Sequence, residues 1–420
     1  MSRRLGLSFA AMLAALPLAL GGCASMYFRD AGPPPEIRLE LARLQFSEYW
    51  TGIVFNGEKI GFTHFTIRKD AGTGRYEIRS EASFVLRFLG IEKKIQLKSR
   101  DVVGPDLTLV EFTYEYRIDD SELLVSGRHR GGEVAATIVT GGKPTEQRLP
   151  VEGKLYPSSV IALYPALYGL EIGREHTYPV YSGETQAVLE ATQRTTGYQQ
   201  SDLFLGYAFK VETTMGGQSV TTWIGLDGKP VFELAMHGVM ISYLEDSQSA
   251  TRYLALASLN KKESLVEYSL VRPDRPISDP RSVSALRVAL TGASHAPPSD
   301  SWQRCVREPR EFDCDIRSGG LRDPGAEPPT EKLRARYLEP SITVQSSDPI
   351  IRRLANSIIG SAASPEERIA LILRWLDENI KKSPLDVFSA LDVLQQREAE
   401  CQGYAYLYTA LARASGIPTR

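Results

Sequence analysis

The sequence of 420 residues has few of the side chains that build metal centres and disulfide scaffolds. It contains four cysteines and five histidines, and the histidines are scattered at His64, His129, His176, His237 and His295. So few cysteines exclude a disulfide-dense scaffold. Because metal sites gather several ligands at short spacing, the scattered histidines predict no metal site.

An excess of charge of either sign is also missing. There are 49 Lys and Arg residues against 51 Asp and Glu residues, so the net charge is −2. A nearly neutral chain without a basic stripe attracts nucleic acid weakly, and we expect no nucleic-acid partner. The hydrophobic share of 42% and the charged share of 24% are ordinary for globular proteins, which excludes a disordered tail, a collagen and a multi-span membrane protein.

The long apolar run at the N-terminus is too short and too interrupted for a membrane span of about 20 residues. It extends from Leu5 to Leu20 and follows the basic stretch Ser2–Arg4. A basic start followed by an apolar run and small residues is typical of a secretory signal peptide. We therefore expect a signal peptide at residues 1–22.

The end of this segment, Leu20-Gly21-Gly22-Cys23, resembles a bacterial lipobox. The resemblance implies cleavage before Cys23 and a diacylglyceryl lipid on its thiol, which anchors a protein to a membrane without a transmembrane helix. The absence of Asp after the cysteine favours the outer membrane. We expect an exported bacterial lipoprotein on the periplasmic side, with residues 23–46 as a membrane-tether linker. The alternative is an ordinary secretory signal with a coincidental cysteine.

Residues 47–265 have the pattern of a large antiparallel β-rich domain. Asn56-Gly57 separates two aromatic and β-branched runs, which predicts a hairpin, and Asp227-Gly228 predicts a second one. Between Phe112 and Ile118 apolar and polar residues alternate, as in a half-buried strand. The stretch 157–170 holds the one helix we expect here. This domain resembles the β-rich region that precedes the catalytic domain of bacterial transglutaminase-like proteins, and its histidines are interpreted as structural or surface residues.

Residues 266–340 are predicted to be a connector with a strand within 277–292 and flexible Pro- and Gly-rich loops. Cys305 and Cys314 lie nine positions apart in this connector. In an exported protein such a close pair favours a disulfide that closes a small loop. Two free thiols are the alternative, and no further ligands for zinc are near.

Residues 341–420 change to a helical pattern. Ser364-Pro365-Glu366-Glu367 is typical of a helix start, and apolar residues follow at helical spacing up to Ile380. A short helix is expected from Ser389 to about Gln396. A further helix begins at Cys401 and ends near Gly416.

Cys401 at the start of that helix is the candidate catalytic residue. Free N–H groups and the helix dipole at this end favour an anion, so we expect them to stabilise a thiolate, and the same N–H groups could hold an oxyanion. Burial behind Tyr404 and Tyr408 is expected to oppose the thiolate by removing water. The alternative is that Cys401 is a small buried core residue.

The string that runs from Cys401-x-Gly-Tyr-Ala to Gly-Ile-Pro-x-Arg420 resembles the first half of a transglutaminase-like domain, a relative of the papain-like cysteine enzymes. The resemblance implies that Cys401 is the nucleophile of a Cys-His-Asp triad that cleaves or transfers peptide amide bonds through a thioester. It implies no metal or organic cofactor. Peptide or peptidoglycan-stem amides are the implied substrates.

The chain departs from the family pattern in two ways. Ala399-Glu400 stands where the family commonly has glycine and an acidic residue, and none of the nineteen residues after Cys401 is His or Asp. A thiol without a positioned base is a poor acyl-transfer catalyst. We therefore predict that the domain is cut off after its nucleophile helix and that these 420 residues are inactive.

Taken together, these patterns predict an α+β multidomain protein. A large antiparallel β-rich N-terminal domain is followed by a partial, mainly helical transglutaminase-like domain. Two functions remain open at this point. One is a cell-envelope lipoprotein whose complete thiol domain acts as an amidase or peptidase, and the other is a non-enzymatic envelope binding or scaffold lipoprotein that uses the β-rich domain.

Overall fold

The structure, a computed structural model, describes residues 27–88, 91–251, 273–291, 293, 296–297, 299–300, 302–309, 311–318 and 330–420. Among these, residues up to 251 and residues 340–417 form one compact unit, and residues 273–339 with 418–420 form a second one. The expected signal peptide at 1–22, Cys23, His295 and the loop residues 319–329 lie outside the described residues.

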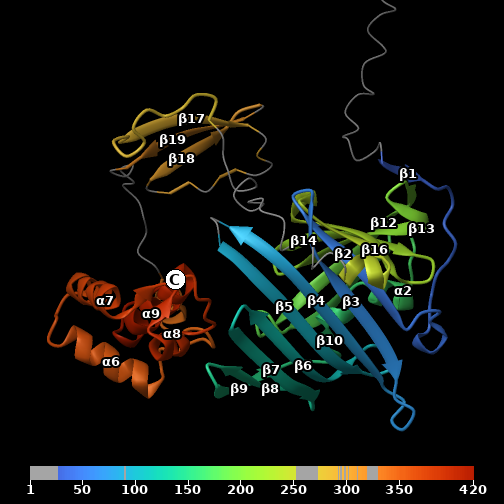
Figure 1. The fold of residues 1–420 in the computed structure, drawn as a ribbon, viewed down its shortest axis with the longest axis horizontal. Coiled ribbons are helices and arrows are strands. Elements are labelled where there is room, and N and C mark those ends of the chain that lie inside the picture. The colour runs from blue at the N-terminus through green and yellow to red at the C-terminus, as the bar shows by residue number, and fades with distance from the viewer. Residues whose placement is uncertain are drawn as a thin grey trace, which may run out of the picture. The chain divides into compact units, whose positions relative to one another are not determined.

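The first unit is built on one sheet, whose described strands pair in the order β10-β11-β12-β13-β14-β15-β16-β2-β3-β4-β5-β6-β7-β8-β9, with β1 at the side of β12 (Figure 1). Neighbours are antiparallel except for β10 and β11. The strands are β1 (Phe28–Asp30), β2 (Glu48–Phe55), β3 (Glu58–Lys69), β4 (Tyr76–Phe88), β5 (Ile91–Val103), β6 (Leu109–Ile118), β7 (Ser121–Arg130), β8 (Glu133–Thr140), β9 (Lys143–Pro150), β10 (Tyr156–Pro157), β11 (Glu175–Ser182), β12 (Ala187–Ser201), β13 (Phe204–Met215), β14 (Gln218–Gly225), β15 (Pro230–Ala235) and β16 (Met240–Glu245).

Both predicted hairpins are present. Asn56 and Gly57 take φ angles of 47° and 79° in the turn between β2 and β3, the left-handed conformation that a two-residue hairpin turn requires. Asp227-Gly228 joins β14 to β15, and the alternating stretch at 112–118 lies in β6.

A core forms where the sheet packs on the segment between β10 and β11. Val160 and Leu163 of that segment are buried against Ile78 of β4, Val103 of β5 and Val180 of β11. Because these strands come from both halves of the strand order, the sheet curves around the segment. The expected helix at 157–170 is shorter than predicted: a 3-10 turn at Ser158–Val160 precedes α2 (Tyr164–Tyr168), which Gly169 ends at a φ of 115°.

The C-terminal residues of the first unit are mainly helical. They form α6 (Pro349–Ile359), α7 (Pro365–Asn379), α8 (Ala390–Gln396) and α9 (Cys401–Ala414), with a short parallel pair of strands, β20 (Lys381–Lys382) and β21 (Glu398–Ala399). The predicted helix start at Ser364 is a full capping box with Glu367. Ile372 and Leu376 of α7 pack with Leu407 and Leu411 of α9 in one buried cluster.

The second unit holds a three-stranded antiparallel sheet in the order β17-β19-β18, with β17 (Ala285–Thr291), β18 (Gln303–Arg307) and β19 (Glu311–Arg317). It also holds the short helix α5 (Glu331–Arg336), whose N-cap is Thr330. The predicted fold class is confirmed, since a large antiparallel sheet comes first and α6–α9 follow near the C-terminus.

Candidate thiol site at Cys401

Cys401 is the first residue of α9, and the residue before it caps the helix. The Glu400 carboxylate accepts hydrogen bonds from the backbone N–H groups of Gln402 (2.9 Å) and Gly403 (3.1 Å). N–H groups in the first turn have no partner within a helix, so a carboxylate there satisfies them and complements the helix dipole. Glu400 therefore fixes the start of the helix at the cysteine.

Packing along one face holds α9 in place. Leu407 and Leu411 are fully buried, as their spacing predicts. A side chain at Gly403 would come within 2.5 Å of Val387 Cγ2 and 2.6 Å of Ala399 Cβ, closer than such atoms approach in proteins. Glycine two positions after the cysteine therefore lets α9 lie directly on the strand and loop that precede it.

The thiol itself is exposed, which corrects the expected burial behind Tyr404 and Tyr408. It also contradicts the alternative of a buried core cysteine. The Cys401 thiol donates a hydrogen bond to Glu400 Oε2 at 2.9 Å. This hydrogen bond and the negative charge of Glu400 raise the pKa of the Cys401 thiol above its ordinary value.

The backbone N–H groups of Gln402 and Cys401 do act to lower the pKa of the thiol, as expected, but the hydrogen bond and charge of Glu400 outweigh them. The Glu400 carboxylate occupies the place at which an anion would meet the N–H groups of Gln402 and Gly403. A helix end favours an exposed anion by only about 0.3–1 kcal/mol, and here a carboxylate in direct contact acts against it. A thiol that is kept neutral needs a base before it can attack a carbonyl group.

The backbone around Glu400 is tied to the preceding loop. The Glu400 N–H donates to the Leu385 carbonyl at 3.1 Å, and the Ser383 N–H donates to the Ala399 carbonyl at 3.1 Å. Ala399 is fully buried in β21, where extended backbone accepts any residue. The alanine that replaces the family's glycine therefore leaves the entry to α9 intact.

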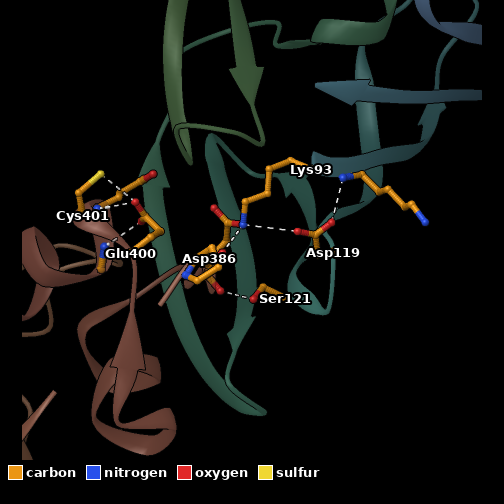
Figure 2. Close-up of polar contacts among 10 residues, drawn as sticks. Lys93, Asp119, Ser121, Asp386, Glu400 and Cys401 are labelled. Atoms are coloured by element: carbon orange, nitrogen blue, oxygen red, sulfur yellow. Dashed lines mark hydrogen bonds and ion pairs between the residues drawn. The ribbon is translucent and has the colours of Figure 1, made fainter. Parts of the chain in front are cut away.

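Residues of the large sheet hold this loop. Figure 2 shows Lys93 of β5 between the Asp386 and Asp119 carboxylates. Its ammonium group also bonds the Pro384 carbonyl, and the Ser121 hydroxyl donates to the Asp386 carbonyl. Lys93 and Asp386 are each 21% exposed, so water screens their ion pair only in part. The sheet is thereby linked through one loop to the residue that caps the cysteine helix.

A second polar contact joins the same two regions. Thr140 at the end of β8 donates from its hydroxyl to the Ser389 hydroxyl at 3.1 Å, and both side chains are buried. Ser389 is the N-cap of α8 and accepts from the Asp392 N–H at 3.3 Å. The short helix predicted from Ser389 therefore starts on the sheet.

The histidine side chains that the structure describes have neighbours other than Cys401. His64 stacks on Trp50 and lies 3.0 Å from Glu48 Oε2, His176 lies 3.2 Å from the Gly169 carbonyl, and His129 has a buried Nε2 atom. Burial lowers the pKa of His176. Neither of these hydrogen bonds reaches Cys401, whose thiol is paired with Glu400. Within the described ranges, no group of three or more His, Cys, Asp or Glu residues could hold a metal ion.

Cys305 and Cys314 form a disulfide in the second unit. They stand opposite each other in register on β18 and β19, with their Cα atoms 4.1 Å apart. The bridge therefore joins neighbouring strands of the small sheet, and the two cysteines are not free thiols.

The lipidation candidate Cys23 lies outside the described residues. Among the helices that the structure describes, none is long and apolar enough to cross a membrane.

Comparison with known proteins bears on the cysteine helix. Residues 352–420 match the sequence model of the transglutaminase-like superfamily, which confirms the resemblance over this stretch. None of the curated proteins matches the sequence. Among solved structures, a β-barrel-like protein of a domain of unknown function from Brucella abortus is similar with a TM-score of 0.37 and 8% identity, over 47% of this chain and 95% of that chain.

Sequence reasoning missed two parts of this site. Glu400 is not among the residue types that typically cap a helix, so its N-cap role could not be assigned from sequence, although a carboxylate at a helix N-terminus is favourable. Lys93 and Asp386 gave no indication of their pairing, because they are 293 positions apart.

Proposed function

We propose that this protein is a cell-envelope lipoprotein that carries a transglutaminase-like thiol domain. One observation carries the proposal: Cys401 is an exposed first residue of a helix, within the stretch that matches the transglutaminase-like superfamily. The lipobox-like sequence at Cys23 supports the envelope location, with lipid as the anchor.

The proposed chemistry is acyl transfer from a peptide amide. The Cys401 thiolate attacks the amide carbonyl and forms a thioester, the amine leaves with a proton, and water or a second amine then takes the acyl group. Peptide or peptidoglycan-stem amides are the proposed substrates. Because Glu400 raises the pKa of the thiol, turnover requires a base, and we propose that a His positioned by an Asp, neither of them within the cysteine helix, supplies it.

The experiment is to read the coding sequence past Arg420 and to express the chain with whatever follows. A His and then an Asp in strand patterns, together with amide turnover that Cys401→Ala abolishes, would support the proposal. Turnover that persists in Cys401→Ala would contradict it, because the thiol would then have no part in the reaction.

A second candidate is a non-enzymatic binding or scaffold lipoprotein. A polar cavity of about 510 Å³ favours it, since the cavity lies on the outer face of β3–β6 and is lined by side chains that include His64, Arg79 and Lys98. A stop codon directly after Arg420 in intact genomic DNA would favour this candidate over the enzyme.

A further inference from the structure

Exposed apolar side chains gather at one end of the large sheet. Leu203, Leu205 and Tyr207 lie on the hairpin between β12 and β13, and Leu226 lies on the turn between β14 and β15. Since Ala208 pairs with Gly225, the turn and the hairpin are at the same end of the sheet. Tyr27 belongs to this end too, because the next residue, in β1, pairs with the last residue of β12.

The hairpin is shaped to present Leu205 rather than to bury it. The register shifts between Gln200 and Ser201, and Gly206 takes a φ of 79° in the resulting bulge. Leu205 is 97% exposed, while Phe204 beside it packs against Phe28 of β1. Single exposed leucines are common on soluble proteins, but Leu205 is one of five exposed apolar side chains at this end of the sheet.

The charges at this end are paired within the protein. Asp202 in the hairpin turn forms an ion pair with Arg29 at 2.6 Å, and Asp227 forms one with Lys229 at 3.0 Å. Pairing lowers the cost of bringing these carboxylates close to an apolar surface. Tyr27 and Tyr207 add rings of the kind that favour a membrane–water interface.

The chain also ties this end to the position of the anchor. β1 lies beside β12 (Figure 1) and runs antiparallel to it, so Phe28, its first residue, pairs with Ser201, the last residue of β12. Cys23 lies four positions before Tyr27, a reach of at most about 14 Å for an extended chain. A lipid on Cys23 would therefore keep Tyr27, which lies at the hairpin end of the sheet, within about that distance of the bilayer surface.

We infer that the β12–β13 hairpin tip, with Tyr27 and Leu226, is a membrane-contact patch. It inserts Leu203 and Leu205 into the interface of the bilayer that holds the lipid on Cys23. This inference rests on the proposed lipoprotein. Leu226 and the two tyrosines complete the apolar contact, so the sheet is held against the membrane at this end.

The test uses the full lipidated protein in vesicles of phosphatidylcholine and phosphatidylglycerol. An environment-sensitive dye is placed on Leu205→Cys, or on Gln218→Cys as the matched control, both combined with Cys401→Ser. Gln218 is an exposed hairpin residue beyond the other end of β13, about 33 Å along the strand. The dye at 205 is expected to shift to shorter wavelength and to be quenched several-fold more by a lipid-borne nitroxide than the dye at 218.

Each other outcome overturns the inference in a distinguishable way. If the dyes at 205 and 218 show equal, water-like emission on membrane-bound protein, the membrane-contact patch is contradicted and the proposed lipoprotein is not. Protection at 205 without quenching by the lipid assigns the patch to a second copy or another protein. Absence of a fatty acid on Cys23 by mass spectrometry removes the lipoprotein proposal, and the inference with it.

Discussion

At the scale of single residues, the pair of Cys401 and Glu400 controls the chemistry that the helix end can perform. One carboxylate caps the helix through two N–H groups and also accepts the hydrogen bond of the thiol. The acceptor capacity of a carboxylate allows all three bonds. The consequence is a helix end whose N–H groups have partners and a thiol whose pKa is raised.

Replacing Glu400 by Gln is expected to lower the pKa of Cys401. The amide oxygen can still cap the helix, but the negative charge that raises the pKa of the thiol is removed. The rate of alkylation by iodoacetamide, measured against pH, should rise to its plateau at lower pH in Glu400→Gln than in the wild type. Glu398→Gln is the matched control, because Glu398 lies two positions away and pairs with Lys381 instead. An unchanged alkylation profile in Glu400→Gln would show that Glu400 does not control the thiol.

Asp101 is a second residue whose charge the fold disfavours. It is fully buried and accepts hydrogen bonds from Tyr114 (2.7 Å) and Ser159 (2.6 Å). Burial raises its pKa to about 6, although both hydrogen bonds act in the opposite direction. The folded protein therefore holds a proton on Asp101 at a pH where the unfolded chain has lost it.

This shift predicts a pH-dependent stability. The stabilisation that Asp101 contributes is complete below its unfolded pKa near 4 and is lost as the pH rises through about 6. Relative to Asp101→Asn, the free energy of unfolding of the wild type should therefore be lower at pH 7.5 than at pH 4 by about 2 kcal/mol, from about 1.4 kcal/mol per pKa unit, since the unfolded carboxyl is already partly ionised at pH 4. Urea unfolding of the wild type and of Asp101→Asn at pH 4 and pH 7.5 measures this difference in the free energy of unfolding.

Asp106→Asn is the control for the sign of this effect. Burial acts to raise the pKa of Asp106, but hydrogen bonds from Lys154 and Thr108 lower it overall. The stability that the Asp106 carboxylate contributes is therefore lost as the pH falls. The difference in free energy of unfolding between the wild type and Asp106→Asn should thus change with pH in the opposite direction. The same sign for both variants would contradict the assignment.

At the scale of elements, the loop between β20 and α8 connects the sheet to the cysteine helix. Lys93 and Ser121 hold the loop at Asp386, and the loop carbonyl of Leu385 holds the Glu400 N–H. Buried or half-buried contacts of this kind raise the free energy of local unfolding. The sheet therefore contributes to the position of Cys401 through this loop, in addition to the contact of Thr140 with Ser389.

Lys93→Ala is expected to loosen this loop. The substitution removes the ammonium group that lies between Asp386 and Asp119, at a cost of about 1–2 kcal/mol, typical for hydrogen bonds to charged groups. Hydrogen exchange at residues 383–403 should become several-fold faster, measured by mass spectrometry. Lys94→Ala on the next residue of β5 is the control and should leave this exchange unchanged. Equal exchange in Lys93→Ala and wild type would remove the proposed link.

Local chemistry explains which elements could be predicted. Asn56-Gly57 and the capping box at Ser364 each act through a few neighbouring residues, and both hairpin and helix appear where they were expected. The pairing of β16 with β2 and the contact of Lys93 with Asp386 join distant parts of the chain, so no local pattern specifies them. The effect of Glu400 on the pKa of Cys401 was missed because it depends on where the Glu400 side chain turns.

At the scale of the whole molecule, the proposed anchor is a lipid on Cys23. The wild type is expected to partition into the detergent phase and to incorporate labelled fatty acid, and Cys23→Ala is expected to lose both properties because the lipid has no attachment point. Detergent phase separation and metabolic labelling measure this. A Cys23→Ala protein that stays membrane-bound, with a wild type that takes up no label, would show that the lipobox interpretation is wrong.

The central claim joins these scales: Cys401 begins a helix within the stretch that matches the transglutaminase-like superfamily, but the hydrogen bond and charge of Glu400 raise the pKa of its thiol. The most direct measurement is amide cleavage and amine transfer by the 420-residue chain on peptide and peptidoglycan-stem amides, with Cys401→Ala in parallel. The account predicts no turnover above that of Cys401→Ala. Robust turnover that depends on Cys401 would contradict it, because a base would then have to act on the thiol within these 420 residues.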